Sequence, residues 1–172
     1  MCLHRRMALS DIFHAQKVLS VAQSWAPGPN NTLHQLHSLE IEGVTIRGLF
    51  LRVRARADMP DEDVVFQLEY PSPGRRDTAI SRVEWRPITP HKNQGNAPGD
   101  LRFLDIPGSH HHSFELNWLE IEDRMRRSNL PVASPISPDP ANLDALLEFV
   151  RVSFRISGLE LIPTPPWEKA LI

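Results

Sequence analysis

Cysteine is almost absent from this sequence of 172 residues, which contains only Cys2. A single cysteine cannot form an intramolecular disulfide and cannot build a cysteine-based zinc cluster. A metal ion bound by this chain would therefore need histidine, aspartate, glutamate or asparagine ligands.

Long apolar runs are missing as well. No segment approaches the roughly 20 apolar residues that a membrane-spanning helix requires, so we expect no membrane partner. The first residues include basic ones but no apolar core of signal-peptide length before Ser10 and Asp11. We therefore expect a cytoplasmic protein.

Lysine is scarce, with 3 residues among the 19 lysines and arginines, which leaves 16 arginines. The planar guanidinium suits phosphate and carboxylate groups, but a GC-rich genome produces the same bias and is the first explanation. The formal net charge of −2 argues against a general polyanion-binding protein, whose domain is normally basic.

The hydrophobic pattern predicts an α+β protein with one domain over residues 1–172. Apolar spacing predicts an N-terminal helix over 10–25 and a C-terminal helix over 142–156. Alternating residues between turn-forming clusters predict strands over 33–42, 44–56, 64–70 and 79–86. We expect an antiparallel meander of four to six strands that packs one face on the two helices.

Four segments remain outside these elements. Residues 1–9 are expected to form a loose lead-in, 128–140 a proline-rich connector and 158–172 a proline-rich tail. Residues 114–127 fit neither the helical nor the strand period cleanly. Their acidic start and basic end suit a helix dipole, so we favour a helix over a strand there.

Half of the eight histidines lie between Trp85 and Trp118, in a segment whose glycines and prolines predict mostly loop. These four are His91, His110, His111 and His112. If the chain is extended at the triplet, its first and third histidines point to one side and the second to the other. Polar, ionisable side chains on loops are a reasonable place to look for a functional site.

Two chemistries and one alternative fit the histidines. The His-x-His pair formed by His110 and His112 could share a divalent metal ion, completed by His91, Asp105 or Glu115. The same pair could instead supply a general acid and base for phosphodiester cleavage. The alternative is a solvated loop whose histidines only make local hydrogen bonds.

A catalytic interpretation gives each polar residue of the segment a role. His110 and His112 would be the acid–base pair or the metal ligands, and His91 a third member. Asn93 would orient the site, and Arg86 would anchor a phosphate or the transition state.

Arg52, Arg54 and Arg56 alternate along one predicted strand and form a basic face. Such a face could follow the phosphates of a nucleic acid, and Trp85 could stack on a base or sugar. The interpretation that we favour is an exposed sheet face whose arginines pair with carboxylates on adjacent strands. The strand pattern favours Trp85 as a core or lid residue over a stacking one.

The order of motifs in the middle of the chain resembles small bacterial proteins of unknown function. The motifs are Trp-Arg-Pro at 85–87, Pro-His-x-Asn at 90–93 and Gly-Ser-His-His-His-x-Phe-x-x-Asn at 108–117. This resemblance implies no catalytic assignment.

Three functions stay open at this point, and the third, a purely structural subunit, is placed after the other two. The first is a small phosphodiester hydrolase, a nuclease of the kind found in toxin or mobile-element contexts, with nucleic acid as its partner. The second is a non-catalytic binding or inhibitor module that presents the same loops to a protein partner. Its anchoring side chains would be Trp85, Phe114, Trp118 and Arg52.

Overall fold

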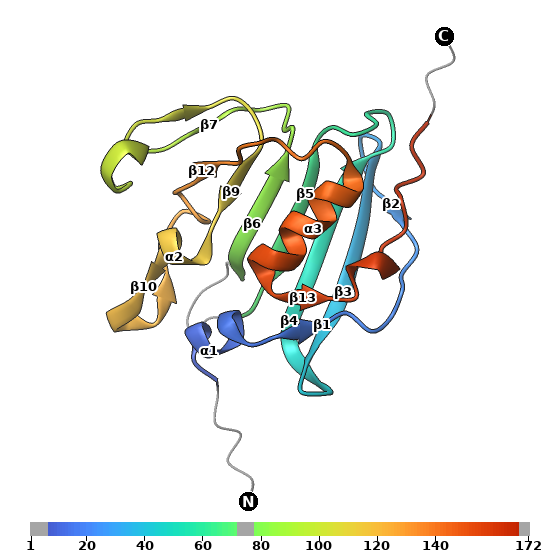
Figure 1. Ribbon diagram of the computed structural model, residues 1–172, viewed down its shortest axis with the longest axis horizontal. Helices are drawn as coiled ribbons and strands as arrows, with labels where there is room; N and C mark the ends of the chain where they lie inside the picture. Colours follow the sequence, from blue (N-terminus) through green and yellow to red (C-terminus); the bar gives the residue numbers. More distant parts are fainter. Residues whose placement is uncertain (1–6, 72–77, 169–172) are drawn as a thin grey trace, which may run out of the picture.

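The computed structural model describes residues 7–71 and 78–168. Over these residues the chain folds around one sheet of nine strands, most of them antiparallel, with few helices (Figure 1). The predicted α+β class with an antiparallel sheet is therefore confirmed. The predicted number of four to six strands is too low.

Four long strands form the centre of the sheet and match the predicted ones to within one residue at each end. They are β3 (Thr32–Ile41), β4 (Val44–Arg56), β5 (Val64–Glu69) and β6 (Ala79–Trp85). Glu42 and Gly43 connect the first two strands, and both have a positive φ, 52° and 75°. Two consecutive residues of this conformation make the tight turn that a two-residue hairpin requires.

The other strands of the main sheet have only two or three residues each. They are β1 (Lys17–Val18), β2 (Ala26–Pro27), β9 (His110–His112), β12 (Ser134–Pro135) and β13 (Ile156–Ser157). The main sheet has the order β12-β9-β6-β5-β4-β3-β1-β13, and β2 pairs with β3. Strands this short contain no measurable alternation, so the sequence pattern does not reveal them.

Two further strand pairs form small sheets of their own. β7 (His91–Lys92) pairs with β8 (Asp105–Ile106), and β10 (Trp118–Leu119) pairs with β11 (Arg124–Met125). A short helical turn, η1 (Gly99–Leu101), lies in the loop of the first pair.

The C-terminal helix predicted over 142–156 is found as α3 (Leu143–Phe154). Asn142 precedes it and accepts a hydrogen bond from the backbone N–H of Ala145 (2.9 Å), which is a helix N-cap. Its fully buried side chains are Leu146, Val150 and Phe154.

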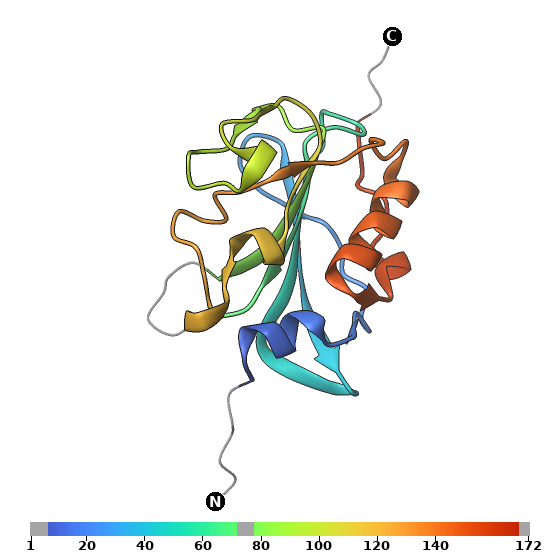
Figure 2. The same ribbon diagram turned by 60° about the vertical axis from the view of Figure 1, so that its left-hand side comes forward.

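The main sheet separates two layers (Figures 1 and 2). On one side lies α3. On the other side lie the two small sheets, the β7–β8 pair and the β10–β11 pair. Strand β9 belongs to the main sheet, so its alternate side chains reach both layers.

The N-terminal helix predicted over 10–25 is wrong beyond residue 14. The observed α1 (Leu9–His14) has six residues and is followed by the extended chain of β1. The buried side chain of Lys17 explains the early end. Its Nζ donates hydrogen bonds of 2.7–3.2 Å to the carbonyl oxygens of Ile12, Phe13 and Ala15. The last carbonyls of a helix need such partners, and here a side chain satisfies them.

The helix favoured over 114–127 is also wrong beyond its first turn. α2 (Phe114–Asn117) is followed by β10, by the short η2 (Glu120–Glu122) and by β11. The buried Asn117 ties this point of the chain to Val132. Its Nδ2 donates to the Val132 carbonyl (2.8 Å), and its Oδ1 accepts from the Val132 N–H (3.0 Å). The chain turns at Asn117 into the extended strand β10, and a helix that continued past Asn117 could not form that strand.

The proline-rich segment 128–140 packs closely against the rest of the chain. Leu130, Val132 and Ala133 are buried, and the segment contributes β12. The tail contains a further turn, η3 (Leu159–Leu161). Residues 1–6, which include Cys2, and residues 169–172 lie outside the described residues. Within the described ranges, the structure has no helix long and apolar enough to cross a membrane.

Candidate metal centre

Strand β9 carries the histidine triplet and pairs with β6. In the antiparallel register, His112 is opposite Arg82, His111 opposite Val83 and His110 opposite Glu84. His111 faces α3, with its ring centroid 5.7 Å from that of Phe149 and 6.0 Å from that of Phe154. His110 and His112 therefore point to the opposite side of the sheet, as the strand alternation predicts.

His91 joins these two histidines from the β7–β8 pair. One ring nitrogen of each of the three residues lies within 4.8 Å of those of the other two. The ring centroids are 4.7 Å apart for His91 and His112, 5.0 Å for His110 and His112, and 5.4 Å for His91 and His110. The predicted convergence of His91, His110 and His112 is thus confirmed. We call these three residues the histidine cluster.

Backbone carbonyls fix the protonation pattern of the two histidines on β9. Nδ1 of His110 lies 2.9 Å from the carbonyl oxygen of Gly108, and Nδ1 of His112 lies 2.7 Å from that of Leu130. A carbonyl oxygen only accepts hydrogen bonds, so Nδ1 carries the proton in both neutral rings. Nε2 of each ring then keeps a free lone pair.

The third ring is held in the opposite tautomer. Nε2 of His91 lies 3.1 Å from Oδ1 of Asn93 and 3.2 Å from the carbonyl oxygen of Pro131, so this nitrogen is the donor. Nδ1 of His91 is then the nitrogen with the free lone pair. Metal-binding histidines in proteins usually donate their second N–H to such an acceptor, which orients the ring and strengthens the ligand.

Asn93 is completely buried beside His91. Its Nδ2 donates to the carbonyl oxygens of Leu101 (3.0 Å) and Ala133 (2.8 Å), and its Oδ1 accepts from the N–H of Ala133 (2.8 Å). These bonds settle which amide atom is the oxygen. The side chain therefore connects the loop of the β7–β8 pair, the 131–133 segment and His91. This position fits the orienting role predicted for Asn93.

Burial keeps the histidines on β9 neutral. His110 and His112 are each 1% exposed, and burial lowers the pKa of His112 to about 4 and also lowers the pKa of His110. Nε2 of His112 is buried and has no hydrogen-bond partner among the described residues. A buried polar atom without a partner costs about 1–3 kcal/mol. A bound metal ion would satisfy this nitrogen.

Glu84 faces the cluster and was not among the predicted site residues. Its Oε1 lies 3.5 Å from Nε2 of His112, and its Oε2 lies 3.8 Å from Nε2 of His110. Arg82 forms an ion pair with the same carboxylate, with 2.9 Å between Nε and Oε1. Burial raises the pKa of Glu84, but the ion pair with the Arg82 guanidinium opposes burial, and the pKa lies below its ordinary value of 4.5. A carboxylate is therefore present beside the cluster at neutral pH.

The other two carboxylates considered as completing ligands lie outside this cluster. The side chain of Asp105 is 71% exposed and pairs with Lys92 at 3.4 Å. Glu115 is exposed. The strand pattern of β6 already places Arg82 and Glu84 on one face. The sequence does not reveal which strand lies beside β6, and this is why Glu84 was missed.

Arg86 is engaged away from the cluster. Its Nε donates to Oδ2 of Asp139 (2.8 Å), and its terminal nitrogens donate to the carbonyls of Asp61, Pro140 and Ala141. These contacts hold the 139–141 segment. The structure therefore does not bring Arg86 to the histidines, and the predicted anchoring role has no support from its position.

The position of Trp85 favours a core residue and gives no support to the predicted stacking role. The residue is 0% exposed, and its Nε1 donates to the carbonyl oxygen of Pro140 (3.0 Å). Phe114, predicted as an anchor for a partner, is likewise buried, whereas Trp118 is half-buried. The alternation of apolar residues in the sequence does not show whether a tryptophan at the end of a strand is buried or exposed.

The arginines of β4 are paired with carboxylates. The ion pairs are Arg52 with Glu69 (2.6 Å), Arg54 with Asp63 (2.8 Å) and Arg56 with Asp58 (2.8 Å). These contacts favour the interpretation of an exposed, charge-balanced sheet face. Nucleic-acid binding by this face stays a prediction.

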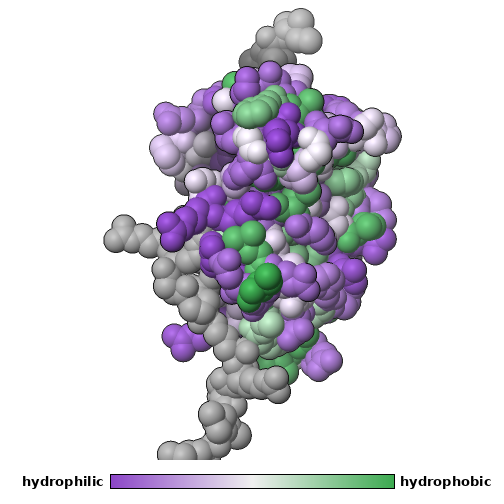
Figure 3. Space-filling model, turned by 90° about the vertical axis from the view of Figure 1, so that its left-hand side faces the viewer, coloured by the Kyte–Doolittle hydropathy of each residue, from purple (hydrophilic) through white to green (hydrophobic). Residues whose placement is uncertain are grey.

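The face that carries the β7–β8 and β10–β11 pairs is mainly hydrophilic, with small separate hydrophobic patches (Figure 3). Exposed apolar side chains among the described residues of these segments include Phe103 and Ile121. This face therefore offers isolated apolar contacts rather than a broad apolar surface.

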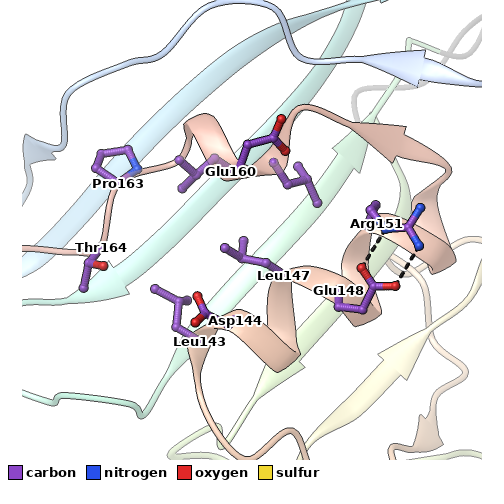
Figure 4. Close-up of a pocket in the computed structure, with 10 residues that line it drawn as sticks. Leu143, Asp144, Leu147, Glu148, Arg151, Glu160, Pro163 and Thr164 are labelled. Atoms are coloured by element: carbon purple, nitrogen blue, oxygen red, sulfur yellow. Dashed lines mark hydrogen bonds and ion pairs between the residues drawn. The ribbon is translucent and has the colours of Figure 1, made fainter.

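A groove of about 470 Å³ lies on the other side of the sheet, between α3 and η3 (Figure 4). Its apolar lining consists of Leu143, Leu147, Leu159, Ile162 and Pro163. Charged side chains border it, and Arg151 donates two hydrogen bonds to Glu148 (2.6 and 2.7 Å). For a protein-binding module, this groove is a better supported surface than the buried Trp85 and Phe114.

Comparison of the chain with protein-family models, with curated proteins and with solved structures finds no match in any of the three. The resemblance to small bacterial proteins of unknown function therefore stays a prediction. The function has to be argued from the geometry of the site.

Proposed function

We propose that this protein binds one divalent transition-metal ion, of the zinc class, at His91, His110 and His112. The observation that carries the proposal is the division of roles between the two nitrogens of each imidazole ring. In every ring one nitrogen donates to a protein oxygen and leaves the other with a free lone pair, and one ring nitrogen of each residue lies within 4.8 Å of those of the other two. Neutral imidazole nitrogens are ligands that zinc and its neighbours prefer.

The role that we propose for the ion is to fasten the β7–β8 pair to the main sheet. His91 lies on β7, which forms strand hydrogen bonds with β8 and, within the described residues, with no strand of the main sheet. His110 and His112 lie on β9, inside that sheet. An ion bound to all three would cross-link two separate sheets, in the way that structural zinc sites add to folding free energy.

Hydrolysis of a phosphodiester, as in a nuclease, is the second candidate function. Three histidine ligands can leave a position at which water binds, and a zinc ion lowers the pKa of such a water to about 7. His91 is only half-buried, and the Glu84 side chain is 22% exposed, which supports access from this edge of the site. The engagement of Arg86 with Asp139 weighs against this candidate.

Metal analysis of protein purified without a histidine tag tests the first proposal. We expect about one zinc-class ion per chain, removal by a chelator, and recovery on addition of Zn²⁺. In the same preparation, hydrolysis of bis(p-nitrophenyl) phosphate by loaded and stripped protein tests the second candidate. Metal binding without hydrolysis would support the structural role of the ion and reject the hydrolase. Absence of both metal binding and hydrolysis would reject the proposed metal site.

A further inference from the structure

The carboxylate of Glu84 is close to the histidine cluster at distances that suit a shared ion better than hydrogen bonds. Its oxygens lie 3.5 Å from Nε2 of His112 and 3.8 Å from Nε2 of His110. Hydrogen bonds between such groups are about 2.7–3.2 Å long. Ligands of a tetrahedral ion with bonds of about 2.0–2.2 Å are roughly 3.3–3.6 Å apart.

Charge balance points in the same direction. Three neutral imidazoles offer a dication no negative charge, and the guanidinium of Arg82 lies next to the site. Glu84 supplies the anionic charge, since its carboxylate already forms an ion pair with Arg82, with 2.9 Å between Nε and Oε1. An ion bound without it would be repelled by Arg82 with little compensation in a buried environment.

The backbone holds Glu84 in place for this role. Glu84 is directly opposite His110 in the β6–β9 register, and Arg82 is directly opposite His112. All four side chains lie on the same face of neighbouring strands, so the separation between carboxylate and imidazoles is fixed by strand pairing. The ring nitrogens of the cluster lie within 4.8 Å of one another, so the side-chain torsions of the histidines as well as those of Glu84 have to adjust around a shared ion.

We propose that Glu84 is the fourth protein ligand of the metal ion, which gives a site of three imidazole nitrogens and one carboxylate oxygen. This inference rests on the metal site proposed above and deepens it. Four protein ligands complete the coordination of a tetrahedral zinc ion, as in structural sites. An ion that takes six ligands would keep two positions free for water or substrate.

Isothermal titration of chelator-treated protein with Zn²⁺ tests the assignment. Glu84→Gln removes the charge and leaves a side chain of the same shape. We expect its zinc affinity to fall by at least about 100-fold, beyond the range of about 10–100-fold that is typical when groups outside the ligand shell are lost. Glu84→Asp keeps the charge but shortens the side chain, and we expect an intermediate loss.

Glu69→Gln is the matched control. Glu69 is also buried, lies on the neighbouring strand β5 and pairs with an arginine, Arg52, at 2.6 Å. We expect this variant to bind zinc within about 3-fold of the wild type, because its carboxylate is not among the cluster contacts. If Glu84→Gln does not fold, the Glu84→Asp variant and this control still give the comparison.

The outcomes separate the two proposals. Zinc binding by Glu84→Gln that equals wild-type binding would overturn the role of Glu84 and leave the histidine site standing. Equal losses in Glu84→Gln and Glu69→Gln would also overturn it, since a general loss of ion pairs would explain both. Absence of zinc binding by the wild-type protein would overturn the metal site itself, and the role of Glu84 with it.

Discussion

Oε1 of Glu84 lies 3.5 Å from Nε2 of His112, although the two residues belong to different strands and are not direct cross-strand partners. This diagonal contact exists because β9 adds to the edge of β6. It brings a carboxylate of the central meander close to a histidine whose Nε2 has no hydrogen-bond partner in the described part of the chain. His91 then brings in the β7–β8 pair from outside the main sheet.

Alanine substitutions in the histidine triplet should distinguish the two metal ligands from the histidine that packs on α3, by their effect on zinc binding. We expect His110→Ala and His112→Ala each to abolish zinc binding, because each removes one of the converging nitrogens. His111→Ala should retain zinc binding, since His111 faces α3. Titration calorimetry with Zn²⁺ measures all three. Loss of zinc binding in His111→Ala, with a folded circular-dichroism spectrum, would contradict the placement of His111 on the opposite face of the sheet from the other two histidines.

The same His111 should make the metal-free protein sensitive to acid. Burial lowers the pKa of His111 to about 4, against an ordinary value of 6.5. The unfolded chain therefore binds the proton at a higher pH than the folded one. The stabilising contribution is fully present above pH 6.5 and is lost as the pH falls towards 4. The loss should reach up to about 3 kcal/mol.

Urea unfolding at pH 7.5 and pH 4.5, in the presence of a chelator, measures this loss. His111→Leu fills the space between β9 and α3 without a titrating group and is the control. We expect the difference in unfolding free energy between the two pH values to be smaller in His111→Leu than in the wild type. An equal difference in both proteins would mean that the acid sensitivity has another source.

The two neighbouring leucines of α3 should differ in their effect on stability. Leu146 is 0% exposed, whereas Leu147 is partly exposed at the groove. We expect Leu146→Ala to lower the free energy of unfolding by about 2–5 kcal/mol and Leu147→Ala by clearly less. Urea unfolding at pH 7.5 gives both values. Losses below about 0.5 kcal/mol for both variants would show that α3 contributes little to the core.

The long strands were predictable because each has at least six residues, which is long enough for a period of two to be recognised over most of its length. The helix predicted over 10–25 failed for a reason that the pattern does not contain. The Nζ of Lys17 donates hydrogen bonds to the carbonyl oxygens at the end of α1, and Lys17 and Val18 pair with β13 as strand β1. Local apolar spacing does not report such a contact.

The candidate site was predictable only in part. The His-x-His spacing and the alternation of an extended chain gave the common side of His110 and His112, and loop closure allowed His91 to approach them. Glu84 depends on the pairing of β6 with a strand of three residues, which no pattern in the sequence specifies. The burial of Trp85 and the pairing of Arg86 with Asp139 likewise depend on how the 139–141 segment packs.

X-ray diffraction from zinc-loaded crystals, with data collected at the zinc absorption edge, tests the metal centre most directly. We predict one strong anomalous peak at about 2.0–2.1 Å from the free ring nitrogens of His91, His110 and His112, and about 2.0–2.2 Å from an oxygen of Glu84. A peak bound by the three histidines alone would retain the metal site and reject Glu84 as a ligand. The absence of a peak between these histidines at saturating zinc would contradict the proposed metal centre.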